Sequence, residues 1–170
     1  LIFPFKRFQI QPVWRADRPQ KGRYREFFQC DADVIGTNSL LCEIELIQLY
    51  DEVFTQLNIP NVEISINNRK ILAGMISLMD ATELFDDVVI ALDKLDKIGI
   101  DKAKEEMLSK GVKAASFSVL DAFLNAKDIS DLAPLLEKSA RGKEGLEELQ
   151  FVISTVADVG LQSTKLVFDI

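Results

Sequence analysis

The strongest constraint on the fold is a pair of runs near the start of the chain in which apolar and polar residues alternate. Such alternation is typical of β-strands that bury only one face. One face of the first run carries Phe8, Ile10, Pro12 and Trp14, and the other carries Gln9, Gln11, Val13 and Arg15. One face of the second run carries Phe28, Cys30, Ala32 and Val34, and the other carries Arg25, Phe27, Gln29, Asp31 and Asp33. Residues 17–24 between them are rich in Pro, Gly and charge, so the two runs predict an antiparallel hairpin.

Most of the rest of the chain has helical spacing, with two short returns to strand-like alternation. Apolar residues recur at helical intervals over residues 39–57, 84–98, 101–110, 117–124 and 146–156, with Asn38 or Ser39 as the expected cap of the first helix. Alternation returns at 62–66 and again at 164–170. We therefore predict an α+β fold in which residues 1–73 and a return strand over 161–170 flank a helical insertion over 74–160.

Composition excludes several kinds of function. The chain has no histidine, so it supplies neither a Ser-His-Asp triad nor a histidine-ligated metal. Its net charge of −7 argues against non-specific nucleic-acid binding, although seven of its basic residues lie between positions 6 and 25. No segment approaches the apolar length of a membrane span, and two cysteines outside any metal-ligand spacing fit a reducing cytoplasm. We read Cys30 as a small core residue because it lies on the apolar face of the hairpin.

The basic cluster falls on and beside the hairpin loop. Arginine presents a planar fork of donors to phosphate or carboxylate oxygens, and an aromatic ring such as Phe27 can stack on a base. Composition alone favours a solvated, charge-rich hairpin about as strongly as a nucleotide site.

The stretch Arg18-Pro19-Gln20-Lys21-Gly22-Arg23-Tyr24-Arg25-Glu26-Phe27, followed by Gln29 and Asp33, resembles the second signature motif of histidyl-tRNA synthetases. These enzymes are class II aminoacyl-tRNA synthetases, built on an antiparallel sheet. Residues 66–72 and 92–97 resemble stretches of the eukaryote-like branch of that family. The resemblance extends along the whole chain and implies part of a class II antiparallel sheet with a helical insertion domain.

The resemblance implies an ATP site at the tip of the hairpin. Arg15 would contact the ATP α-phosphate and the histidine carboxylate, and would stabilise charge at phosphorus. Arg23 would hold the γ-phosphate, and Phe27 would stack on adenine. Asp17 stands where the family usually has Glu, which contacts the adenine end.

The resemblance also implies a histidine site along the strands. Gln29 would contact the amino acid, and Asp33 would accept a hydrogen bond from the substrate imidazole. The alternation independently places Arg15, Phe27, Gln29 and Asp33 on the polar face of the hairpin. Asn67, Asn68 and Arg69, in contrast, are interpreted as a capped helix start.

The implied reaction is the activation of histidine by ATP, with Mg²⁺, followed by transfer to tRNA(His) in a cytoplasmic homodimer. The chain begins without Met and lacks the family's other motifs, so we expect a fragment with little or no activity of its own. One alternative is a non-catalytic relative, such as a regulatory subunit of ATP phosphoribosyltransferase or the synthetase-like region of a stress kinase. Another is a helical interaction module over residues 75–160.

Overall fold

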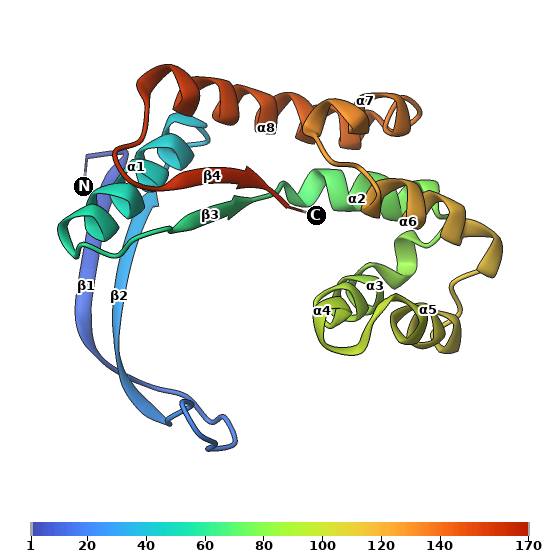
Figure 1. Cartoon of the computed structure of the whole chain (residues 1–170), viewed down its shortest axis with the longest axis horizontal. Coiled ribbons are helices and arrows are strands. Elements are labelled where there is room, and N and C mark those ends of the chain that lie inside the picture. Colours follow the sequence, from blue (N-terminus) through green and yellow to red (C-terminus); the bar gives the residue numbers. More distant parts are fainter. Residues whose placement is uncertain (1, 170) are drawn as a thin grey trace.

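A computed structural model describes residues 2–169 of the chain (Figure 1). A curved two-stranded ribbon stands at one side, a second strand pair crosses the middle, and helices make up the other side. The strands are β1 (Phe5–Trp14), β2 (Glu26–Ile35), β3 (Glu63–Ile66) and β4 (Lys165–Phe168). The α-helices are α1 (Leu41–Gln56), α2 (Arg69–Leu78), α3 (Phe85–Leu92), α4 (Leu95–Ile98), α5 (Ile100–Ser109), α6 (Phe117–Leu124), α7 (Leu132–Leu135) and α8 (Ala140–Val159). Short 3₁₀ turns occupy Thr82–Leu84, Ala114–Ser116 and Ile129–Asp131.

The predicted hairpin is confirmed. β1 and β2 pair antiparallel along their full length, in a register that runs from Phe5 opposite Ile35 to Trp14 opposite Glu26. Beyond the strands, the tip closes with a second small turn in which Gln20 and Arg23 exchange backbone hydrogen bonds of 2.9 and 3.2 Å. Gly22 within that turn has a φ of 78°, a conformation that glycine adopts without steric cost.

The last strand, β4, lies beside β3, and the two strands pair in parallel as a sheet separate from the hairpin. Parallel neighbours need a long crossover connection, because the chain must travel back to the same end of the sheet. Here residues 67–164, which contain α2 to α8, form that connection. The antiparallel part of the described chain is therefore the β1–β2 hairpin alone.

The helices differ from the sequence prediction in several places: α7 was not among the expected helices, and α8 begins at Ala140 and not at residue 146. The helix predicted over 84–98 is divided at Asp93 and Lys94 into α3 and α4, although neither glycine nor proline interrupts it. At this division the Lys94 ammonium lies 2.5 Å from the Glu106 carboxylate of α5. At α1 the N-cap position is occupied by Leu40 and not by Asn38 or Ser39, the expected caps. The Ser39 hydroxyl still accepts a 3.3 Å hydrogen bond from the backbone N–H of Leu41.

The close crossing of α2 and α8 lies at the centre of the helical part. Glycines occupy the contact: a Cβ on Gly74 would lie 2.7 Å from the Cα of Gly142, and one on Gly145 would lie 2.7 Å from the Cβ of Lys70. Residue 74, the expected start of the insertion, thus lies inside α2. The surrounding buried core is almost entirely aliphatic, with Ile71 and Met75 of α2 and Leu149 of α8 among its members.

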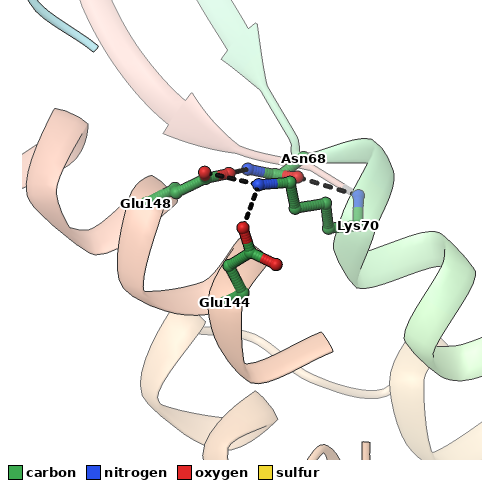
Figure 2. A network of polar contacts seen from close by, with 4 residues as sticks. All are labelled: Asn68, Lys70, Glu144 and Glu148. Atoms are coloured by element: carbon green, nitrogen blue, oxygen red, sulfur yellow. Dashed lines mark hydrogen bonds and ion pairs between the residues drawn. The ribbon is translucent and has the colours of Figure 1, made fainter. Parts of the chain in front are cut away.

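Polar contacts hold one end of this crossing (Figure 2). The Asn68 side chain caps α2 by accepting from the backbone N–H of Lys70, as expected for a capped helix start, and its amide donates to Glu148. The Lys70 ammonium donates to Glu144 and Glu148, each at 2.6 Å. These hydrogen bonds raise the pKa of Lys70, and those from Lys70 and Asn68 lower the pKa of Glu148.

A buried carboxylate connects α1 to the segment that follows α8. Asp51 is only 3% exposed and accepts hydrogen bonds from the backbone N–H groups of Gln162, Ser163 and Thr164, at 2.6, 3.1 and 2.9 Å. Burial alone would raise its pKa, but these hydrogen bonds outweigh it and lower the pKa to about 2. Apolar contacts among Ile44, Ile47, Val152 and Val156 join the same two helices.

The apolar face of the hairpin is exposed within the described chain, which corrects one expectation. Phe8, Ile10, Trp14 and Phe28 are 79%, 65%, 69% and 75% exposed. Cys30 shares this face and is also exposed, so it is not a core residue in the described structure. The reason is that no described element packs across the middle of this face, whereas the sequence pattern shows only which residues share it.

We expect Gly145→Ala to destabilise the chain by about 1 kcal/mol. Alanine gains roughly 1 kcal/mol of helix propensity, but overpacking against the backbone of α2 costs roughly 1–3 kcal/mol. The added methyl would lie 2.9 Å from the backbone nitrogen of Ile71, which cannot move aside cheaply. Urea unfolding checks this, with Ser154→Ala on the exposed side of α8 as the control. A stabilised Gly145→Ala variant would contradict the tight crossing.

We expect Asp51→Asn to remove about 2 kcal/mol of stability at pH 7, the free energy that corresponds to lowering a pKa from 3.8 to about 2. A lowered pKa stabilises the fold above pH 3.8, and this contribution disappears as the pH falls towards 2. The difference between wild type and Asp51→Asn should therefore shrink across that window. Urea unfolding from pH 7 to pH 2 measures it, with the exposed Asp158→Asn as the control. A pH-independent difference would rule out this account.

Candidate functional site

Four of the predicted site residues form one connected cluster at the tip of the hairpin. The Arg23 guanidinium contacts the Asp17 carboxylate through Nη2 at 2.9 Å and Nε at 3.0 Å. Arg15 lies 3.8 Å from the same carboxylate, and its guanidinium carbon sits 4.1 Å from the centre of the Phe27 ring. The cluster thus combines two cations, one anion and an aromatic face.

Backbone contacts hold this cluster in place. The N–H of Arg15 donates to the carbonyl of Arg25 at 2.9 Å and extends the strand ladder by one pair, and the Arg25 side chain donates to the backbone carbonyl of Asp17. The side chains of Arg15 and Arg23 remain about half exposed. An anionic ligand can therefore reach both guanidinium groups from solvent.

The other two predicted residues lie further along the same face of β2. The amide of Gln29 donates to the Asp31 carboxylate at 2.6 Å, and Gln29 is paired across the ladder with Gln11. Asp33 stands opposite Arg7, whose Nε lies 2.8 Å from its Oδ2.

Asp33 and Arg7 also border a cavity of about 570 Å³ between the hairpin, α1 and the segment that follows α8. Acidic residues of α1 line its other wall, namely Glu45, Asp51 and Glu52. Lys6, Phe8 and Val34 of the opposite face line the same cavity, so the cavity lies across the ribbon from the polar face, on which the Asp33 side chain is 47% exposed to solvent.

The six predicted residues form a row and not a compact pocket. Phe27 and Asp33 are six residues apart on one strand, which corresponds to about 20 Å. Such a row suits an elongated ligand that has a base and phosphates at the tip and a hydrogen-bond donor at the other end. Within residues 2–169 there is no cluster of three His, Cys, Asp or Glu side chains that could hold a metal ion.

The sequence analysis assigned no role to three neighbours of these residues: Arg7, Gln9 and Asp31. All three lie on the same polar face, in the register positions next to or opposite Gln29 and Asp33. The alternation places Arg7, Gln9 and Asp31 on the polar face, but it does not say which residues stand opposite one another. That information comes from the register of the two strands.

Comparisons with known proteins agree on one family. The family model described as "Histidyl-tRNA synthetase" matches residues 6–170. Histidine–tRNA ligase of Flavobacterium johnsoniae is 52% identical over 99% of this chain and 36% of its own length. That of Bacteroides fragilis is 48% identical over 96% of this chain and 37% of its own length. The crystal structure of histidyl-tRNA synthetase from Nostoc sp. PCC 7120 superimposes with a TM-score of 0.87 at 29% identity, covering all of this chain and 41% of that one.

Together with the hairpin and its polar face, this structural match defines the class: the fold is part of a class II aminoacyl-tRNA synthetase core with a helical region. Within that class, the chain belongs to the histidyl-tRNA synthetase family. It spans little more than a third of the length of the curated relatives it matches. No helix among residues 2–169 is long and apolar enough to cross a membrane.

Proposed function

We propose that the protein that carries this chain activates histidine with ATP to histidyl-adenylate and pyrophosphate, and then transfers the histidyl group to tRNA(His). The observation that best supports this is the row of side chains on one face of the hairpin, which runs from the arginine cluster around Phe27 to Asp33. Its length of about 20 Å suits an aminoacyl-adenylate in an extended conformation. Family membership supports the same reaction.

At the tip, Arg15 would contact the α-phosphate and the histidine carboxylate, and Arg23 would hold the γ-phosphate. Fixed guanidinium groups stabilise the charge that develops at phosphorus without reorganisation during the reaction. Phe27 would stack on adenine, and Asp17, which already pairs with Arg23, would lie at the adenine end. Magnesium would arrive with the ATP phosphates and neutralise part of their charge, with phosphate oxygens among its ligands.

Along the strand, Gln29 would contact the amino acid and Asp33 would accept the imidazole N–H. A carboxylate that must receive a hydrogen bond discriminates strongly against side chains that cannot donate one. We further propose that residues 74–160 are an insertion domain that approaches the acceptor arm of the tRNA. The whole protein would act as a cytoplasmic homodimer, and residues 1–170 alone would have little or no activity.

Histidine-dependent ATP–pyrophosphate exchange by the native protein, tested against all twenty amino acids, examines this proposal. Exchange should occur with histidine only. Arg15→Ala should lower kcat by roughly a hundredfold or more, because it removes a donor aimed at the developing charge. Asp33→Ala should raise KM for histidine and leave KM for ATP unchanged.

The matched control is Arg69→Ala, which removes an exposed arginine at the start of α2, outside the hairpin. Its exchange rate should equal that of wild type. If wild type exchanges with no amino acid, the proposed activity is wrong. If it exchanges but Arg15→Ala does so equally well, the assignment of the site is wrong.

A further inference from the structure

The Asp33 carboxylate is held from one side only. Its Oδ2 lies 2.8 Å from Nε of Arg7, the residue directly opposite on β1. Within residues 2–169, no side chain or backbone N–H donates to its other oxygen, Oδ1. One oxygen is therefore anchored, and the other is available to a ligand.

Arg7 is itself oriented by a second contact. Its Nη2 donates to Oε1 of Gln9 at 2.8 Å, and the two side chains share a face because they are two residues apart on a strand. The planar guanidinium therefore contacts two groups: it donates to the Gln9 amide and forms an ion pair with the Asp33 carboxylate. A lysine, with a single charged point at its end, could not hold both in this geometry.

Stability alone does not account for this pair. Both side chains are nearly half exposed, and ion pairs at this exposure contribute roughly 0–1 kcal/mol to folding. Orientation offers a better reason, since an aspartate carboxylate that rotates freely must be ordered each time it binds a donor. A partner that fixes it beforehand reduces that entropic cost.

We propose that Arg7 is a positioning residue, which anchors Oδ2 of Asp33 and so presents Oδ1 to the imidazole N–H of the substrate. This inference rests on the proposed function, because it takes Asp33 as the group that recognises histidine. Arg7 itself touches no substrate atom in this arrangement and acts only through Asp33.

The test is a double-mutant cycle in the native protein, followed by histidine-dependent ATP–pyrophosphate exchange. Arg7→Met should raise KM for histidine roughly ten- to a hundredfold, the usual effect of losing a residue that orients a binding group. KM for ATP and kcat should remain at the wild-type values. Adding Arg7→Met to Asp33→Ala should cause no further increase, because Arg7 acts through the carboxylate that is already absent.

Two variants keep the outcome interpretable. Arg7→Lys retains the charge beside Asp33 but not the second contact, so its KM for histidine should lie between those of wild type and Arg7→Met. Lys6→Met removes a comparably exposed ion pair, with Glu45 of α1, at the preceding residue of the same strand, and it should leave KM for histidine unchanged.

Several outcomes would overturn the inference. An unchanged KM for histidine in Arg7→Met would do so, as would an additive double mutant. A parallel loss of kcat, ATP affinity and thermal stability would assign Arg7 a purely structural role. Each of these presupposes exchange by the wild type, so the absence of any histidine-dependent exchange in wild type would instead refute the proposed function itself.

Discussion

The crossing of α2 and α8 is the contact on which the rest of the structure depends. Glycines at 74, 142 and 145 bring the two helix backbones together, and the aliphatic core surrounds the contact. Because α2 directly follows β3 and α8 leads back to β4, the crossing lies within the connection that joins these two parallel strands. A parallel strand pair of only four residues each would contribute little by itself, so its stability derives from the helices that connect it.

The position of the hairpin depends on a second, smaller set of contacts. α1 follows β2 after a short loop and packs on α8 through Ile44 and Ile47. Asp51 then binds the backbone of residues 162–164, just before β4 begins. The candidate site is thus connected to the helical core by α1 and by one buried carboxylate, and the tip of the hairpin, with its arginines, extends away from both (Figure 1).

The sequence predicted those parts of the structure that have a clear period or a specific motif. Alternation over residues 8–15 and 25–34 was sufficient for the hairpin, and the motif around Gly22 was sufficient for the family. Features that depend on tertiary contacts were missed. Nothing local distinguishes Asp51 from the exposed acids around it, because its hydrogen-bond partners at 162–164 are distant in sequence. No breaker marks the division at Asp93. The roles of Arg15, Asp17, Arg23, Phe27, Gln29 and Asp33 remain predictions.

The contact between Arg15 and Phe27 has a consequence for ligand affinity. A base that stacks on the same face of the ring must first displace a guanidinium, at a cost of roughly 0.5–1 kcal/mol for an exposed cation–π contact. The displaced guanidinium then becomes free to bind an anion. A nucleoside would lose this free energy without compensation, whereas the phosphates of a nucleotide would bind the displaced guanidinium and so offset the loss. With the proposed roles of Arg15 and Phe27, the hairpin would link recognition of the base to recognition of the phosphate, and would discriminate against nucleosides before any reaction begins.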